Sequence, residues 1–184
     1  SQSGPTPKES CFDNENLIFR YNKVHSNFEM GLAIGFTRGG YVFGNSFFDN
    51  GKDCDRDTLA LVGLRFEARA ADMFAWSNIM HHNKPWGSYT WNRQGEYCGM
   101  PQNLQGDIHY YNNTFVNNAF MPSNQGVGEG GLSLDANPNG DYGVINNLFV
   151  DNRQGYATRQ QLAFLGGNDI QALRSNTFYL SDAD

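Results

Sequence analysis

The sequence lacks several features that would place it quickly in a large functional class. No run of about 18 apolar residues occurs, so we predict no membrane-spanning helix. No Lys/Arg cluster occurs either, and 13 basic against 19 acidic residues give a net charge of −6, which argues against a nucleic-acid partner. Apolar residues do not recur at helical spacing over a dozen positions, whereas 21 glycines and many asparagines favour short strands separated by turns.

Cysteine is also scarce. Cys11, Cys54 and Cys98 are an odd set, and none lies in a CxxC or another metal-ligand spacing, which argues against a zinc site. In an extracellular protein we expect one disulfide bond and one remaining thiol. Cys54 and Cys98 are the preferred pair because both fall in lateral loops of consecutive repeats. A bond between Cys11 and Cys54 is the alternative.

What the sequence does contain is a repeated segment of the form N-x-φ-x-x-N, where φ is an apolar residue. Its copies follow one another at intervals of 23 to 35 residues, and the last copy ends in Ser instead of Asn. The copies are 22–27, 45–50, 78–83, 113–118, 147–152 and 176–181. Self-similarity at this period is typical of a solenoid, in which each repeat forms one coil.

Apolar residues flank the leading Asn of each copy at fixed distances. Those three positions before it are Phe19, Val42, Ala75, Tyr110, Val144 and Leu173, and those two positions after it are Val24, Phe47, Met80, Phe115, Phe149 and Phe178. Strand side chains alternate, so both columns should face inward from two short strands, with the leading Asn at the turn between them. Asn tolerates a left-handed backbone, and stacked Asn side chains can hydrogen-bond from coil to coil. A third strand per coil is predicted at Leu32–Thr37, Leu59–Phe66, Gly131–Asp135 and Gln161–Leu165.

The repeat resembles that of the parallel β-helix proteins of the pectate lyase superfamily. The segment from Ile108 to Asn118, with its pattern φ-x-φ-x-N-N-x-F-x-x-N, carries the resemblance most clearly, and the likeness extends over roughly Leu17 to Ser181. It implies an all-β fold, a right-handed parallel β-helix of about six coils. We assign residues 17–184 to this domain and residues 1–16 to an N-terminal extension or the remnant of a preceding coil. Neither end has the pattern of a capping helix, so we expect flanking coils or a cap supplied by a partner.

The superfamily includes polysaccharide lyases, glycoside hydrolases, epimerases, phage tailspikes and adhesins, so the resemblance implies no single activity. The longest predicted loop, 84–105, carries Trp86, Tyr89 and Trp91 among charged residues, which is typical of a sugar subsite. With Arg65 and Glu67 on the preceding strand, these aromatics are the candidate substrate-binding residues. The alternatives are that the aromatics fold the loop onto the solenoid, and that Arg65 and Glu67 are ordinary surface residues.

A polysaccharide lyase needs a base next to a uronate carboxylate and a cation to neutralise that carboxylate. The candidate catalytic residues are Lys84, Arg93 and Asp135. Lys84 or Arg93 would be the base, and Asp135 or Glu67 would bind a Ca²⁺ ion that bridges this acidic protein to an acidic polymer. No paired carboxylates of the glycosidase kind occur, so a lyase is favoured over a hydrolase, and whether the chain is an enzyme stays open.

An aromatic lane is predicted on the outer side of the coils. Phe43, Trp76 and Tyr111 occupy the same outward position of consecutive coils, about 4.8 Å apart. Such a lane favours an interface with a flanking domain, a subunit or a filament neighbour, and glycan stacking is the alternative. The His81-His82 pair should point to opposite sides of its strand, so a shared metal ion is not expected.

Two hypotheses of different class follow. The first is a secreted or cell-surface, carbohydrate-active β-helix that binds or cleaves a polysaccharide through the aromatic loop. The second is a structural or adhesive solenoid module of a tailspike, fibre or surface protein, without catalytic activity, that uses the aromatic lane for assembly.

Overall fold

The computed structural model describes residues 14–51, 61–67, 69–91, 96–97, 100–101, 106–118, 130–135, 140–152, 161–165 and 170–181. Within these ranges every regular element is a β-strand. The search for membrane-spanning helices, made over the same residues, finds none.

The strands form three parallel sheets, each built from one strand per coil. Sheet A contains β1 (Asn14–Arg20), β4 (Thr37–Phe43), β7 (Ala71–Trp76), β12 (Ile108–Tyr111), β15 (Tyr142–Ile145) and β18 (Ile170–Arg174). Sheet B contains β2 (Lys23–His25), β5 (Ser46–Phe48), β8 (Ile79–His81), β13 (Thr114–Val116), β16 (Leu148–Val150) and β19 (Thr177–Tyr179). Sheet C contains β3 (Met30–Ile34), β6 (Val62–Phe66), β9 (Trp86–Thr90), β14 (Gly130–Asp135) and β17 (Leu162–Leu165). A short antiparallel pair, β10 (Glu96–Tyr97) and β11 (Met100–Pro101), stands apart from them.

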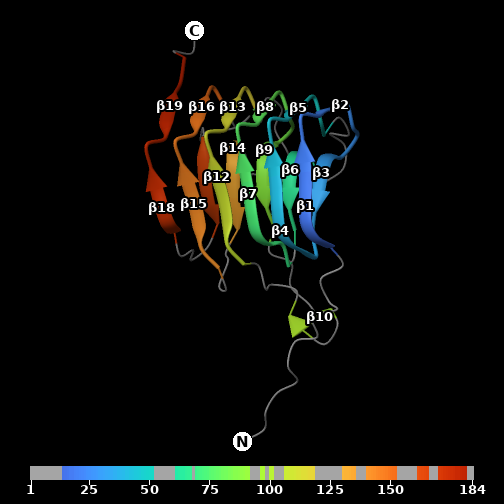
Figure 1. Cartoon of the computed structure of the whole chain (residues 1–184). Helices are drawn as coiled ribbons and strands as arrows, with labels where there is room; N and C mark the ends of the chain where they lie inside the picture. Colours follow the sequence, from blue (N-terminus) through green and yellow to red (C-terminus); the bar gives the residue numbers. More distant parts are fainter. Residues whose placement is uncertain are drawn as a thin grey trace, which may run out of the picture.

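The chain is therefore a right-handed parallel β-helix, as the repeat predicts. The coils stack in sequence order from the first, β1 to β3, to the last, β18 and β19 (Figure 1). The register confirms both inner columns, because each residue pairs with the corresponding residue of the next coil. The predicted third strand is present as β3, β6, β14 and β17.

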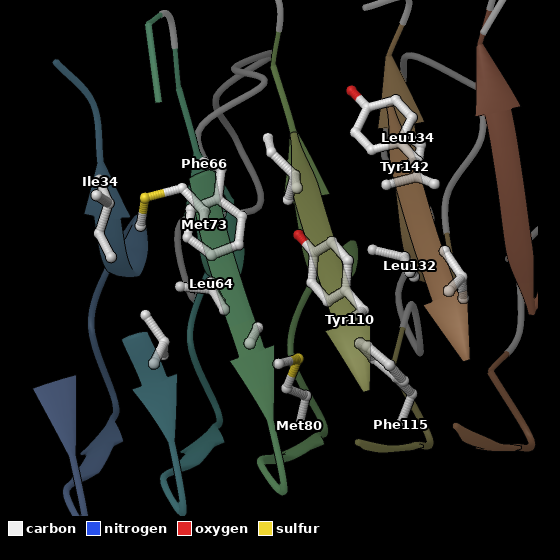
Figure 2. Close-up of a cluster of buried hydrophobic side chains, with 14 of the residues drawn as sticks. Ile34, Leu64, Phe66, Met73, Met80, Tyr110, Phe115, Leu132, Leu134 and Tyr142 are labelled. Carbon is white, nitrogen blue, oxygen red and sulfur yellow. The ribbon is translucent and has the colours of Figure 1, made fainter. Parts of the chain in front are cut away.

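The core lies between the three sheets. Val42, Tyr110, Phe115 and Phe149 are completely buried, and Phe115 stacks on Phe149 with ring centroids 4.8 Å apart. Figure 2 shows how the buried side chains point into this space, among them Ile34, Leu64, Phe66, Met73, Met80, Leu132, Leu134 and Tyr142. Burial of these side chains is the main force that holds the coils together.

Two ladders of Asn side chains join the coils at their corners. The A–B ladder, between sheets A and B, contains Asn22, Asn45, Asn78, Asn113, Asn147 and Asn176. In its repeating pattern, the backbone N–H and Nδ2 of Asn45 both donate to Oδ1 of Asn78 at 3.0 Å, while Nδ2 also donates to the carbonyl of Phe19 at 3.0 Å. One Asn thus ties three coils together, which confirms the predicted ladder.

The B–C ladder, between sheets B and C, repeats the same bonds through the second Asn of each copy. Its members are Asn27, Asn50, Asn83, Asn118 and Asn152, followed by Gln161. Gln161 closes this ladder, because its Oε1 accepts from Nδ2 of Asn152 at 2.7 Å and its Nε2 donates to the carbonyl of Tyr179 at 2.9 Å.

The left-handed backbone conformation was predicted at the ladder Asn, and the structure has it one residue earlier. The residues before the ladder Asn, not the ladder Asn themselves, have positive φ, as at Ser77 (52°) and His82 (54°). The ladder Asn must point inward for its bonds, so the preceding residue makes the turn. The prediction that Asn is used here for its left-handed tolerance was wrong, and its hydrogen-bonding reason was right.

The predicted loop 84–105 contains a strand of sheet C. Residues 86–90 form β9, which pairs with β6 on one side and β14 on the other. The prediction missed this strand because its inward positions are polar, Ser88 and Thr90. Both are satisfied inside the core, since Ser88 Oγ lies 3.0 Å from the Tyr110 hydroxyl and Thr90 Oγ1 lies 3.1 Å from the Tyr142 hydroxyl.

Candidate functional site

The outer face of sheet C brings together six of the predicted site residues. Arg65, Tyr89 and Ser133 share one outward row across β6, β9 and β14, and the next outward positions are Glu67, Trp91 and Asp135. Because β6, β9 and β14 are neighbours in one sheet, these side chains from three coils form one cluster, which we call the sheet C cluster together with Trp86.

Arg65 is the charged centre of the sheet C cluster. Its Nε donates to Oε1 of Glu67 at 2.8 Å, and Nη2 contacts the same oxygen. The guanidinium carbon lies 4.7 Å from the centre of the Trp91 ring, which is a cation–π distance. Arg65 is only 5% exposed, and Glu67 balances its charge. Arg65 is therefore not an ordinary solvated surface residue.

The aromatics of the sheet C cluster are buried. Trp86 is 1% exposed and Tyr89 is 3% exposed, and their rings stack with centroids 4.9 Å apart. Burial raises the pKa of the Tyr89 hydroxyl, the carboxylate of Asp135 raises it further, and Arg65 opposes both, so the phenol is protonated at neutral pH. Because a sugar can stack only on an accessible ring face, the burial of Trp86 and Tyr89 favours the packing alternative.

The candidate catalytic residues do not meet. Lys84 lies before β9 begins, whereas Asp135 ends the parallel neighbouring strand β14. The two residues are therefore at opposite edges of sheet C, separated by a strand length of about 16 Å. Arg93 lies outside the described residues, as do Cys11, Cys54 and Cys98. Within the described part of the chain, no group of three or more His, Cys, Asp or Glu could hold a metal ion.

The outer face of sheet A is more accessible and carries two aromatic rows. The first is the predicted lane, with Phe43, Trp76 and Tyr111 in register. Phe43 and Trp76 stack almost in parallel, with centroids 4.4 Å apart and an interplanar angle of 7°. Tyr111 departs from the lane, because its ring stacks on His109 of the same strand at 5.5 Å and 10°. Tyr41 also contacts the indole of Trp76, with centroids 5.8 Å apart and an interplanar angle of 74°.

The second row runs beside the first. Tyr41 stacks on Phe74 with centroids 5.7 Å apart, and Phe74 stacks on His109 at 5.0 Å. The imidazole of His109 lies over Gly143, where a Cβ atom would come within 2.4 Å of Nδ1. Tyr41 is 40% exposed, and Phe43, Phe74, Trp76 and Tyr111 are half-buried.

A row of carboxylates borders the aromatic rows. Asp72, Asp107 and Asp141 precede Phe74, His109 and Gly143 by two positions in three successive coils, and all three carboxylates act on His109. Burial lowers the pKa of His109, while the three carboxylates oppose this effect. We call the two aromatic rows and this acidic border the sheet A platform.

The histidine pair differs from its prediction. Nδ1 of His81 and Nδ1 of His82 lie 2.9 Å apart, with the rings nearly perpendicular. The positive φ of His82 turns its side chain to the same outer side as that of His81, so the alternation expected of a strand does not hold at this corner. His81 also stacks on Phe48 at 5.0 Å.

Comparison of the chain with protein-family models, curated proteins and solved structures finds no match. The candidate site is therefore argued from the sequence repeat and the geometry of its residues. One usable signal was overlooked, a glycine at the second position of each of four sheet C strands, at 31, 63, 87 and 131. A Cβ atom at Gly87 would lie 2.6 Å from the carbonyl oxygen of Gly131 and 2.8 Å from Nδ2 of Asn118, which explains the glycine and would have located β9.

Proposed function

We propose that the chain is an extracellular carbohydrate-binding β-helix that holds a polysaccharide on the sheet A platform. The observation that carries the proposal is the row of half-exposed aromatic rings beside a parallel row of carboxylates, repeated from coil to coil. Rings supply apolar contact for sugar C–H groups, and carboxylates accept hydrogen bonds from hydroxyl groups. The likeness of the repeat to that of the pectate lyase superfamily also supports a carbohydrate partner.

Trp76 is the residue on which binding should depend most. Stacking on Phe43 holds the indole in place, and Tyr111 turns away toward His109, so the far face of the indole can contact a sugar ring. A pre-positioned indole loses little conformational entropy when it binds. Burial raises the pKa of the Tyr111 hydroxyl, and Arg174, at the same outward position two coils further along, opposes this effect.

The charge of the platform favours a neutral polysaccharide and binding over cleavage. Asp72, Asp107 and Asp141 would repel a uronate carboxylate at short range. Lyase chemistry needs a cation at that point, and Arg20 and Arg174 occupy the ends of the outward row of this face. Cleavage of an acidic polymer with Ca²⁺ is therefore the weaker alternative.

Affinity electrophoresis in gels containing neutral polysaccharides, such as mixed-linkage glucan or xylan, tests the proposal. We expect retention by at least one neutral polymer and a loss of about tenfold or more in Trp76→Ala. Phe48→Ala is the matched control, since Phe48 stacks between His25 and His81 on the outer face of sheet B. Equal retention of wild type and Trp76→Ala, at equal melting temperature, would contradict the proposal.

A parallel assay separates binding from cleavage. Incubation with pectate and alginate, with and without Ca²⁺, should leave the ultraviolet absorbance unchanged, because a lyase product would carry an absorbing conjugated double bond. An increase in absorbance that Ca²⁺ stimulates would contradict the proposal and would indicate lyase activity. Lys84, Arg93 and Asp135 would then be the residues to mutate.

A further inference from the structure

Two imidazoles meet at the corner that follows β8, on the outer side of the third coil. Nδ1 of His81 and Nδ1 of His82 lie 2.9 Å apart, and the two rings are nearly perpendicular. His81 is half-buried and His82 is exposed, so solvent reaches the pair. The corner follows a strand of sheet B, so the pair belongs neither to the sheet A platform nor to the sheet C cluster.

The backbone of this corner brings the two rings together. His82 has a φ of 54°, and its N–H donates to the carbonyl of Val116 in the next coil at 3.2 Å. The corresponding corner of the first coil has the same form, because Ser26 has a φ of 60° and its Oγ lies 3.1 Å from Nδ1 of His25. The side chain at this corner position thus reaches Nδ1 of a preceding His, and in the third coil that side chain is a second imidazole.

The ring of His81 is held in place by the preceding coil. It stacks on Phe48 with centroids 5.0 Å apart and an interplanar angle of 4°, and Phe48 stacks in turn on His25 at 4.6 Å. Burial and the nearby His82 lower the pKa of His81, while the carboxylate of Asp49 opposes them. The imidazole of His81 is therefore neutral at neutral pH, which is the form that binds a metal ion.

The distance between the two nitrogen atoms favours one coordination geometry. Since an imidazole nitrogen lies about 2.0–2.1 Å from a bound metal ion, two nitrogen atoms 2.9 Å apart subtend an angle of about 90° at that ion. This is the angle between neighbouring ligands in the square-planar and tetragonal complexes that Cu²⁺ and Ni²⁺ form with N and O ligands. Tetrahedral Zn²⁺ would need the same two atoms about 3.3–3.4 Å apart.

From this geometry we propose that Nδ1 of His81 and Nδ1 of His82 together bind one Cu²⁺ ion on the outer side of the third coil. A ring that carries its hydrogen on Nδ1 takes the tautomer with hydrogen on Nε2, so that both Nδ1 atoms offer a lone pair. Within the described part of the chain no third His, Cys, Asp or Glu joins them in a metal-binding group, and water fills the other equatorial positions. The exposed carboxylate of Asp49 adds a negative charge that favours a cation.

Titration of the full chain with Cu²⁺, followed by calorimetry and electron paramagnetic resonance, tests this proposal. The three cysteines are alkylated first, so that their thiols cannot bind or reduce the ion. We expect saturable binding of one Cu²⁺ ion per chain and an axial spectrum with two coordinated imidazole nitrogens. The absence of saturable binding, or a spectrum with a single imidazole, would overturn the proposal.

Three variants decide which histidines bind the ion. His82→Asn and His81→Phe introduce the residue types that the corresponding positions of neighbouring coils already carry, Asn117 and Phe48, so the fold should be retained. Each should weaken Cu²⁺ binding by about tenfold or more and remove one imidazole from the spectrum. His25→Phe is the matched control, because it keeps the ring stack and leaves the pair intact. Unchanged affinity in His81→Phe and His82→Asn, or an equal loss in His25→Phe, would contradict the proposal.

Discussion

The outer faces of sheets A and C have the same construction and different accessibility. Both direct alternate residues of parallel strands outward, and both carry a Trp in a strand of the third coil, Trp76 in β7 and Trp86 in β9. Trp76 is half-buried, whereas Trp86 is 1% exposed and stacks on Tyr89. An aromatic, charged segment therefore forms an accessible surface in one place and a packed, neutralised cluster in the other.

The largest expected effect comes from removing each of the two indoles in turn. Trp86→Ala should reduce the free energy of unfolding by about 3–5 kcal/mol, because it leaves a cavity beside Tyr89 and Val62. Trp76→Ala should cost clearly less, since part of that side chain is in water in the folded state. Urea unfolding followed by circular dichroism measures both. A Trp86→Ala variant as stable as Trp76→Ala would show that the two faces are equivalent.

Adding one methyl group to each face gives a smaller effect. Gly87→Ala should cost about 1–3 kcal/mol, because the new Cβ would lie 2.6 Å from a backbone carbonyl oxygen that the sheet holds in place. Gly143→Ala should cost less, because its Cβ would meet the imidazole of His109, and a side chain can shift more easily than a backbone carbonyl. Thermal unfolding of the two variants compares them. The reverse order would mean that the sheet A platform is the more rigid face.

The smallest expected effect concerns the pH dependence of stability at His109. Burial lowers the pKa of this imidazole below 6.5, against the opposing carboxylates of Asp107, Asp141 and Asp72, so the folded state binds a proton less readily than the unfolded chain. His109 therefore reduces stability as the pH falls below about 6.5, and it has no such effect above that pH.

The variant His109→Phe tests this effect, because it keeps a ring between Phe74 and Tyr111 and removes the buried Nδ1, which has no hydrogen-bond partner among the described residues. The melting temperature of the variant relative to wild type should rise between pH 7 and pH 5, by a few degrees at most. A constant difference over this range would show that His109 does not titrate differently in the folded state. The difference between variant and wild type at each pH, measured at matched ionic strength, largely cancels the titration of carboxylates that both proteins share.

The parts of the fold that repeat could be predicted from the sequence. The inner columns through Val42 and Phe47 were correct to the residue, because strand alternation and the Asn spacing together fix the register. β9 could not be found in this way, since its inward Ser88 and Thr90 break the apolar pattern. Their partners, the hydroxyl groups of Tyr110 and Tyr142, come from other strands more than 20 residues away, and no local pattern records such a bond.

The candidate site was predictable only in part, for a related reason. Outward residues such as Arg65, Tyr89 and Asp135 were named from composition, and the structure brings them to one face. Their burial, the contact of Arg65 with Glu67, and the turn of Tyr111 toward His109 depend on neighbours that the repeat does not encode.

The sequence alone determined the β-helix, its coils, its inner columns and its Asn ladders, because each of these rests on residues at fixed positions within a repeat. The tertiary structure decided which outer face is accessible and how each corner turns its side chains. Strand alternation is the same on every sheet, so the local sequence pattern does not show whether an outward side chain is buried. Its burial depends on contacts with residues far away in the chain. The same holds for the end coils, whose exposed Leu173 and Phe178 look in the sequence like any other core position.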